Sequence, residues 1–364
     1  MKILTIVGCR PQFIKSASFS RGLKKSKFKE SIKEIILHTG QHYDEEMSGK
    51  FFYELSIPEP KYNLGIGGGS HGENTGRMIE HIEKILLKEQ PNLCLLFGDT
   101  DSTLSGAIAA SKLAIPIAHI ESGLRSFRKN QPEEINRVVT DHLSDICYTP
   151  SSIGSSNLVK EGIKKENIIE VGDIMQDNNV YFSSQADKNK NFIKQNNIEN
   201  EQYLLVTLHR KENVQNHLKL KEILISLNQS KHKIIFPIHP STKKKIEEWD
   251  LNKYLKNLII INPCGFIDFA TLAKNSILII TDSGGVQKEA YFYGKPCVTL
   301  REETEWPELV NCGWNTLIKD FNSFEIIQAI NRQLVIDLKK KREEFYGNGD
   351  TSNKIINHLA SKYL

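Results

Sequence analysis

The chain has 364 residues, of which 39% are hydrophobic and 25% are charged, a composition typical of a folded globular protein. The length predicts about two domains. A formal net charge of only +4 gives no reason to expect a nucleic-acid partner, and no apolar run approaches the roughly 20 residues of a transmembrane helix.

The N-terminal sequence MKILTIVG has one lysine and a short apolar run but no small-residue cleavage site. It therefore predicts a first strand rather than a signal peptide. The six cysteines are scattered singly, and none forms a CxxC pair. This usage predicts a reduced, cytoplasmic protein without a zinc site.

Apolar runs of strand length alternate along the chain with helical patterns. The predicted strands include Ile3–Val7, Ile35–Leu37, Leu93–Phe97, Ile115–Ile120, Tyr203–Leu208, Ile234–Ile238, Leu258–Ile261 and Ile277–Ile280. These runs are apolar on both faces, as strands of a parallel sheet covered by helices are. Apolar residues recur at three and four positions over Met78–Lys88, which predicts a helix. The fold class is therefore α/β, with doubly wound parallel sheets.

A polar segment, Asp177–Gln202, interrupts this order, which restarts at Tyr203. We interpret the segment as helix and connection at a domain junction. The expected domains are residues 1–175 and 176–350. In open parallel sheets ligands bind beyond the carboxyl ends of the strands, so the polar residues at those ends are the candidate functional residues.

The first such end is VGCRPQFIK, Val7 to Lys15. Arg10 precedes Pro11, a favourable first residue of a helix. Together with Lys15 it would lie near a helix N-terminus, where backbone N–H groups also favour anions. This pattern predicts a site for a pyrophosphate or carboxylate, although two surface cations at a helix start would give the same pattern.

Three further ends in the first domain carry acids. Asp99 follows LCLLF, Glu121 ends the strand in HIESGLRS, and Glu133 opens a proline-started helix in QPEEINR, with Arg137 one turn later. Helix capping and dipole charges explain Asp99 and Glu133 equally well when each is taken alone. Together the three carboxylates form the set that acid–base chemistry on a sugar or similar polyol needs.

The second domain has histidines at two strand ends, His209 in TLHRKEN and His239 in IHPST. Lone histidines are more often structural than catalytic. The segment IITDSGGVQKEA ends a strand at Asp282 and continues into a helix. Ser283, Gly284 and Gly285 would let a phosphate approach the N–H groups of that helix, although a tight strand-to-helix turn needs the same residues.

In this order the motifs resemble the non-hydrolysing UDP-N-acetylglucosamine 2-epimerase family over almost the whole chain. The matching segments are GCRPQFIK, TGQHYDEEMS, FGDTDSTLSGA, HIESGLRSF, PEEINR, TLHRKEN, IHPSTKK and TDSGGVQKEA. The resemblance implies two Rossmann-like domains around a central cleft, as in GT-B glycosyltransferases, with UDP mainly on the second domain. It also implies that a C-terminal helix, here residues 351–364, crosses back to the first domain.

The resemblance also implies roles for the candidate residues. The catalytic candidates are Asp99, Glu121, Glu133 and His209, of which His209 would also contact the nucleotide. The substrate-binding candidates are Arg10, Lys15, Arg137, His239, Phe269, Ser283, Gly284, Gly285 and Glu289. Of the latter set, the Ser-Gly-Gly run would hold the diphosphate of UDP, Glu289 the ribose and Phe269 the uracil.

The implied reaction is C2 epimerisation of UDP-GlcNAc to UDP-ManNAc for surface polysaccharide synthesis. UDP is eliminated in anti fashion to leave a 2-acetamidoglucal, and it then adds back. Such a reaction needs a base at C2 and stabilisation of the leaving diphosphate. It implies no metal, no nicotinamide and no other cofactor. The expected partner is the UDP-sugar, with neither nucleic acid nor membrane, and family members are commonly homodimers.

Two positions depart from the family pattern. Gln12 replaces the glutamate of GxRPE, and Trp306 replaces the substrate-contacting arginine of TERPE. With GDIMQD and GGSHGENTGRM, these departures resemble a branch that acts on UDP-2,3-diacetamido-2,3-dideoxyglucuronic acid, so this sugar is the alternative substrate. The allosteric UDP-GlcNAc site of some members lies near the equivalents of Gln41 and His42, both of which are present.

Three other function classes remain open from the sequence. A hydrolysing epimerase would release UDP and free N-acetylmannosamine. A UDP-sugar glycosyltransferase shares the fold but would need an acceptor and lacks the three carboxylates. A non-catalytic nucleotide-sugar sensor would require those carboxylates to point away from the ligand.

Overall fold

The computed structural model describes residues 1–40, 57–186, 189–196, 198, 202–338 and 342–364. The chain forms two compact units. The first consists of Met1–Asn178 together with Glu344–Leu364, and the second of Asn179–Glu343.

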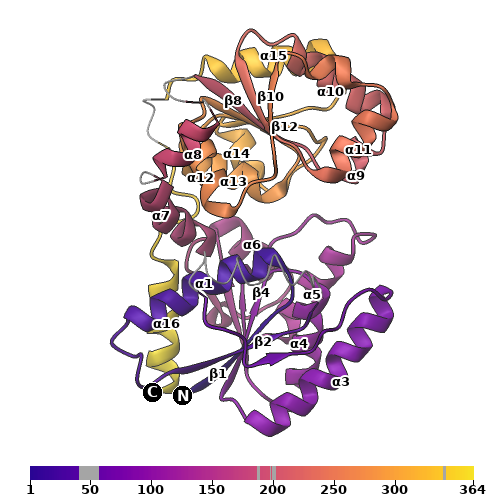
Figure 1. Ribbon diagram of the computed structural model, residues 1–364. Coiled ribbons are helices and arrows are strands. Elements are labelled where there is room, and N and C mark those ends of the chain that lie inside the picture. The colour runs from indigo at the N-terminus through magenta and orange to yellow at the C-terminus, as the bar shows by residue number, and fades with distance from the viewer. Residues whose placement is uncertain (41–56, 187–188, 197, 199–201, 339–341) are drawn as a thin grey trace. The chain divides into compact units, whose positions relative to one another are not determined.

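The first unit is built on one parallel sheet. Its strands are β1 (Lys2–Val7), β2 (Lys33–His38), β3 (Tyr62–Asn63), β4 (Leu93–Phe97), β5 (Ile117–Ile120), β6 (Ile146–Thr149) and β7 (Ile168–Glu170). Its helices are α1 (Arg10–Lys25), α3 (His71–Glu89), α4 (Asp101–Lys112), α5 (Pro132–Leu143), α6 (Ser152–Lys160), the start of α7 (Ile174–Ala186), and α16 (Thr351–Tyr363). Within the described ranges the strand order is β3-β2-β1-β4-β5-β6-β7. Figure 1 shows α1 and α16 on one side of this sheet and α3, α4 and α5 on the other.

The second unit repeats this plan. Its strands are β8 (Tyr203–Thr207), β9 (Lys233–Pro237), β10 (Leu258–Ile261), β11 (Leu278–Thr281), β12 (Cys297–Thr299) and β13 (Asn315–Leu317). Its helices are α8 (Lys190–Gln195), α9 (Lys211–Val214), α10 (His217–Asn228), α11 (Pro240–Glu248), α12 (Phe266–Asn275), α13 (Gly284–Phe292), α14 (Pro307–Asn311) and α15 (Ser323–Leu334). The described part of its sheet has the order β10-β9-β8-β11-β12-β13, again all parallel.

The strand order reverses direction once in each sheet. In the first unit β1 lies between β2 and β4, and in the second β8 lies between β9 and β11. The central strands are buried on both faces: all residues of β4 and of β11 are buried. Ligands of open parallel sheets bind at the carboxyl side of this reversal point. The residues that follow β1, β4, β8 and β11 are therefore the ones that the fold presents to a ligand.

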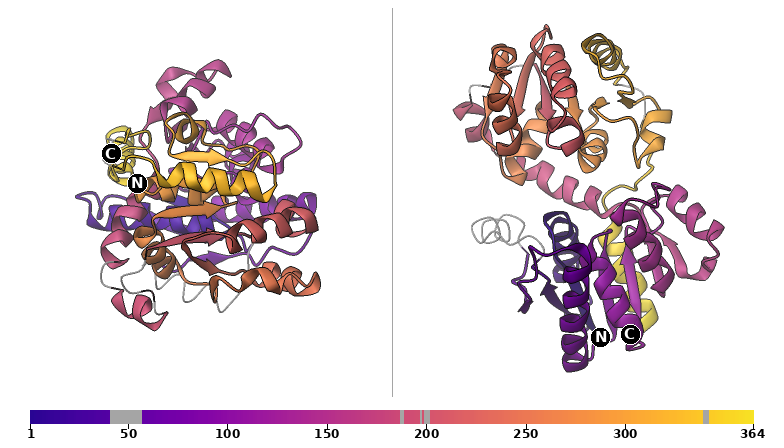
Figure 2. Two further views of the ribbon diagram at one scale, coloured as in Figure 1. Left: turned by 90° about the horizontal axis from the view of Figure 1, so that it is seen from above. Right: turned by 90° about the vertical axis from the view of Figure 1, so that its right-hand side faces the viewer.

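The C-terminal helix α16 packs against α1 in the first unit. Asp177 caps its first turn, accepting hydrogen bonds from the N–H groups of Thr351 at 3.0 Å and Ser352 at 2.7 Å. Gly22 of α1 leaves room for this contact, since a Cβ there would lie 3.0 Å from the Cβ of Ser352. Both views of Figure 2 accordingly show the two chain termini close together.

The predicted fold class of two doubly wound parallel-sheet units is confirmed. Strands that sequence patterns did not identify include β3 and β12, which have two and three residues. Runs that short carry too few side chains to show a period. In the described residues, no helix is both long and apolar enough to span a membrane.

Candidate active site

Gln12 joins the ends of β1 and β4 in the first unit. Its side-chain oxygen accepts from the N–H groups of Gly8 at 2.7 Å and Cys9 at 3.3 Å. Its amide nitrogen donates to the carbonyl of Phe97 and to Thr103 Oγ1, both at 2.8 Å. A glutamate could not donate to the Phe97 carbonyl. The amide of Gln12 therefore makes a contact here that an ionised glutamate could not make.

Lys15 and Glu121 form a largely buried ion pair between α1 and the end of β5. Gly98, at the end of β4, lies beside this pair, because a Cβ there would be 3.2 Å from Lys15 Nζ and 3.5 Å from Glu121 Oε2. Glu121 has a φ of +77°, a conformation that costs a non-glycine residue about 1–3 kcal/mol and is enriched at functional sites. The structure thus brings together two of the candidate residues next to the point where the sheet reverses.

Asp99 and Arg137 form a second ion pair beside Gly98. Arg137 donates to Asp99 Oδ2 from Nε at 2.9 Å and from Nη2 at 2.5 Å, and to Glu134 Oε2 from Nη1 at 3.1 Å. Burial lowers the pKa of Arg137, but the two carboxylates more than offset this and raise it. The 30% exposure of the Asp99 side chain leaves this carboxylate accessible to a substrate.

Two candidate residues of this unit lie outside the buried cluster. Glu133 is exposed in the first turn of α5, and its side chain makes neither a hydrogen bond nor an ion pair with another described residue. Its neighbour Glu134 takes the structural role, accepting from the N–H groups of Ser126 at 2.9 Å and Phe127 at 2.8 Å. Arg10 is exposed at the start of α1.

A buried network that sequence reasoning missed supports the end of β4. His119 Nε2 lies 2.7 Å from the carbonyl of Gly98, and its Nδ1 lies 2.7 Å from Asp141. Both partners accept hydrogen bonds, so the imidazole lies between two acceptors. Burial raises the pKa of Asp141, but His119 and Arg125 more than offset it and hold that pKa below its ordinary value. His119 lies two residues before Glu121 in the motif HIESGLRS, inside the predicted strand. A polar side chain within a buried strand was the signal that could have identified it.

In the second unit, Asp282 organises the end of β8. This carboxylate is fully buried and accepts from the N–H groups of His209 at 3.1 Å and Arg210 at 2.9 Å. His209 Nδ1 lies 3.3 Å from Asp282, while 48% of the His209 side chain is exposed. Asp282 therefore fixes the backbone of His209 and Arg210 and orients the Nδ1 edge of the imidazole. The rest of the ring is left for a ligand.

The helix α13 begins beside two arginines and one glutamate. A Cβ on Gly284 would lie 3.4 Å from Glu305 Oε2, 3.7 Å from Arg301 Nη1 and 4.0 Å from Arg210 Nη2. A Cβ on Gly285 would meet no described atom within 4 Å. Arg301 binds Glu305 through two hydrogen bonds of 2.9 Å each. Burial raises the pKa of Glu305, but the hydrogen bonds and charge of Arg301 outweigh burial, so this pKa lies below its ordinary value. Two arginines against one carboxylate, beside open helix N–H groups, favour an anion.

The remaining candidates of the second unit are dispersed. Ser283 is the N-cap residue of α13, and Glu289 lies half-buried on the same helix. His239 is exposed at the end of β9, where its Nδ1 accepts from the N–H of Ser241 at 3.2 Å and thereby caps α11. Phe269 of α12 packs against the unit's hydrophobic core.

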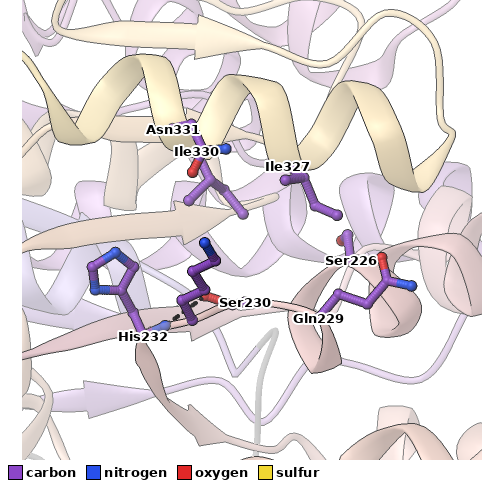
Figure 3. Close-up of a pocket in the computed structure, with 8 residues that line it drawn as sticks. Ser226, Gln229, Ser230, His232, Ile327, Ile330 and Asn331 are labelled. Carbon is purple, nitrogen blue, oxygen red and sulfur yellow. Dashed lines mark hydrogen bonds between the residues drawn. The ribbon is translucent and has the colours of Figure 1, made fainter.

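The predicted allosteric residues, a search for metal-ligating groups and one pocket add no residue to the candidate site. Gln41 and His42 lie outside the described residues. No group of three or more metal-ligating side chains occurs in the described part of the chain. A pocket of about 150 Å³ lies between α10, α15 and the amino end of β9 (Figure 3). His239 follows the carboxyl end of the same strand. The pocket is lined by Ser226, Gln229, Ser230, Lys231, His232, Ile327, Ile330 and Asn331.

Comparison with known proteins assigns this arrangement to a family. A family model described as UDP-N-acetylglucosamine 2-epimerase matches residues 24–360. A UDP-N-acetylglucosamine 2-epimerase homolog of Methanococcus maripaludis is 48% identical over 99% of this chain and 100% of its own length. The UDP-2,3-diacetamido-2,3-dideoxy-D-glucuronate 2-epimerase of Pseudomonas aeruginosa is 44% identical over 99% of each chain.

A solved structure is similar over the same extent. The crystal structure of UDP-GlcNAc 2-epimerase from Methanocaldococcus jannaschii, in complex with UDP-GlcNAc and UDP, matches with a TM-score of 0.88 at 44% sequence identity. The match covers 99% of this chain and 100% of that one. The likeness agrees with the expected GT-B type of α/β fold.

Proposed function

Because this chain belongs to the UDP-N-acetylglucosamine 2-epimerase family, we propose that it epimerises a UDP-2-acetamido sugar at C2 without net hydrolysis. The conversion of UDP-GlcNAc to UDP-ManNAc is the simplest form of this reaction. The observation that carries the proposal is the pair of carboxylates at the ends of neighbouring strands, Asp99 held by Arg137 and Glu121 held by Lys15.

The chemistry explains why two carboxylates are needed. The C2 proton has no adjacent carbonyl, so its removal is coupled to departure of the anomeric leaving group. A base takes the C2 proton while the bond from C1 to the UDP oxygen breaks, and a C1–C2 double bond forms. In the reverse sense, an acid returns a proton to the opposite face of C2 and UDP adds back to C1. Two groups that exchange protons on two faces satisfy this scheme.

Asp99 and Glu121 are the proposed acid and base, and Glu133 of α5 is the third candidate for either role. Arg137 is not one of them, because a guanidinium keeps its proton. Its role is to hold Asp99 in one orientation through two hydrogen bonds. Positioning of this kind lowers the barrier by fixing the approach of the reacting atoms.

The proposed role of the second unit is to bind UDP. Ser283, Gly284 and Gly285 would hold the diphosphate, as the open helix start and the nearby Arg210 and Arg301 support. His209, Arg10 and Lys15 would add positive or donor groups to the phosphates. Glu289 would bind the ribose, Phe269 the uracil and His239 a further part of the substrate.

A second substrate has its own support. Trp306 stands where the family has an arginine, and the Pseudomonas aeruginosa relative at 44% identity is an epimerase of a diacetamido uronate. The alternative is therefore the same reaction on UDP-2,3-diacetamido-2,3-dideoxyglucuronic acid.

Product analysis tests the proposal against the other function classes. The protein is incubated with UDP-GlcNAc and, separately, with the diacetamido uronate, and the products are separated by anion-exchange chromatography. We expect a UDP-linked epimer with the total UDP-sugar unchanged. Equimolar UDP and free N-acetylmannosamine would identify a hydrolysing epimerase, and product that appears only with an added acceptor would identify a glycosyltransferase. Binding without any product would identify a sensor.

We further propose that the enzyme is a cytoplasmic homodimer that supplies a precursor for surface polysaccharide. Sedimentation equilibrium tests the assembly, since a dimer has twice the 41.5 kDa mass of the chain. A single species at the chain mass would contradict this part of the proposal.

A further inference from the structure

Trp306 raises a specific question about charge. The sequence resemblance implies a substrate-contacting arginine at this position, and this chain has an uncharged tryptophan there. The residue is not a surface substitution, because only 5% of it is exposed. Its indole N–H donates to the carbonyl of Gly284 at 3.0 Å. The tryptophan is therefore fastened to the first turn of α13, the proposed diphosphate site.

A cation is present on a neighbouring residue. Lys288 lies one turn beyond Gly284 on α13, with 2% of it exposed, and its ammonium is 3.8 Å from the centroid of the Trp306 ring. An ammonium over the face of a desolvated indole is among the strongest cation–π arrangements. The ring thus stabilises a buried positive charge close to the start of the helix.

The segment that carries Trp306 is itself tied to α13. Thr304 Oγ1 donates to Gln287 Oε1 at 2.6 Å and accepts from the N–H of Trp306 at 3.1 Å. Gln287 in turn donates to the carbonyl of Ser283 at 3.2 Å. Residues 304–306 are therefore joined to the first two turns of α13 at several points, which fixes the ring over Lys288.

The two positions depend on each other. An arginine at position 306 would put a second cation against the ammonium of Lys288, and like charges at this separation repel strongly when desolvated. A tryptophan offers the electron-rich face of a ring instead. The charge of the side chain at position 306 therefore has to be compatible with the charge of the side chain at position 288.

We propose that Lys288, held against the Trp306 ring, is a source of positive potential for the diphosphate at Ser283–Gly285, with Trp306 as its positioning residue. This inference rests on the proposed function, because it requires UDP to bind at the start of α13. It makes a pair of residues, rather than one, responsible for the strength of nucleotide binding.

The test is the affinity for UDP, measured by isothermal titration calorimetry on the full chain. Lys288→Met is expected to weaken UDP binding by about tenfold at low ionic strength, and by less at high ionic strength because salt screens the lost charge. Trp306→Phe keeps a ring for Lys288 and is expected to stay within about threefold of the wild type. Trp306→Arg is expected to weaken binding as well, because repulsion between the arginine and the Lys288 ammonium would displace both from the start of α13.

An exchange variant separates charge matching from simple damage to the fold. Lys288→Glu combined with Trp306→Arg converts the cation–π pair into an ion pair with the cation at position 306. It is expected to recover most of the affinity that Trp306→Arg loses. Lys245 also stacks on a tryptophan, 5.2 Å from the Trp249 ring centroid, on α11. Lys245→Met is the matched control, and we expect no change in UDP affinity.

The outcomes distinguish this inference from the proposed function. If the wild type does not bind UDP, the proposed nucleotide site is wrong and the inference falls with it. If the wild type binds UDP and Lys288→Met binds it equally well, only the inference is overturned. Should Lys288→Met not fold, the exchange variant decides instead: recovery relative to Trp306→Arg supports the pair, and no recovery overturns it.

Discussion

At the scale of single residues, Asp99 and Glu121 carry the proposed chemistry. Asp99→Asn and Glu121→Gln keep the shape of each side chain but remove its ability to exchange a proton. We expect each to lower turnover by at least about a hundredfold and to leave UDP affinity nearly unchanged, measured by coupled assay and calorimetry. Glu166→Gln, at an exposed glutamate, is the control. Wild-type turnover in either variant would refute the assignment.

Arg137 is expected to act through Asp99. Its planar group reaches Asp99 from two nitrogens and Glu134 from a third, a geometry that an ammonium cannot reproduce. Arg137→Lys keeps the charge but loses the fork, so kcat should fall by about tenfold or more while KM changes little. An increase in KM at unchanged kcat would instead indicate that Arg137 binds substrate directly.

Glu34 of β2 lies outside the candidate site, and we expect it to make the stability of the protein depend on pH. It accepts from the hydroxyls of Thr5 and Ser20, each at 2.7 Å, and burial raises its pKa from 4.5 to about 6. The folded protein therefore holds this proton more tightly than the unfolded chain does. The resulting stability is complete below the unfolded pKa and is lost as the pH rises through the folded one.

The variant Glu34→Gln removes this titration. Its free energy of unfolding relative to the wild type should rise by about 2 kcal/mol from about pH 4 to about pH 7.5. Urea titrations followed by circular dichroism measure the difference. A constant offset between the two proteins across this range would contradict the prediction.

At the scale of elements, the capping of α16 makes the C-terminal helix part of the first unit. Asp177→Ala removes the acceptor of two N–H groups and is expected to destabilise the helix by about 1–2 kcal/mol. Hydrogen exchange of the Thr351 and Ser352 amides should accelerate. Asp350→Ala is the control, because the Asp350 side chain makes no cap bond although it stands at the N-cap position. Equal acceleration in both variants would argue against the cap.

The length of each strand determined whether it could be predicted from the sequence. Long buried strands such as β1, β4 and β8 were identifiable because runs of five or six mostly apolar residues are typical of a strand buried on both faces. Strands as short as β3 and β12 were not. The residues at strand ends followed from the rule that ligands bind there, so Asp99, Glu121 and His209 could be proposed before the structure.

Contacts between distant elements could not be predicted. The bridging role of Gln12 depends on Phe97 and Thr103, which are 85 and 91 positions away. The pairing of Lys288 with Trp306 likewise depends on how α13 meets the following loop. Glu133 and Glu134 are adjacent in sequence, and only the packing of α5 decides that Glu134 is the buried one. Such partners are properties of packing and not of local pattern.

At the scale of the whole molecule, the proposal requires both units to act on one substrate molecule. The first unit would supply the acid and base groups, and the second would bind UDP and hold it after its bond to C1 breaks. Retention of UDP during this step distinguishes an epimerase from a hydrolase. The fate of the C2 proton and of UDP in the same reaction therefore tests the account as a whole.

The most direct test is proton NMR of UDP-GlcNAc incubated with the protein in heavy water. The account predicts UDP-ManNAc with deuterium at C2 and no net loss of UDP-sugar, because the proton returned to C2 comes from a group that has exchanged with solvent. An epimer that keeps its original C2 proton in heavy water would contradict a mechanism in which carboxylates exchange that proton. If UDP-GlcNAc stays unchanged while UDP still binds, the same measurement on the diacetamido uronate decides, and no deuterium at C2 of either sugar would contradict the proposed reaction.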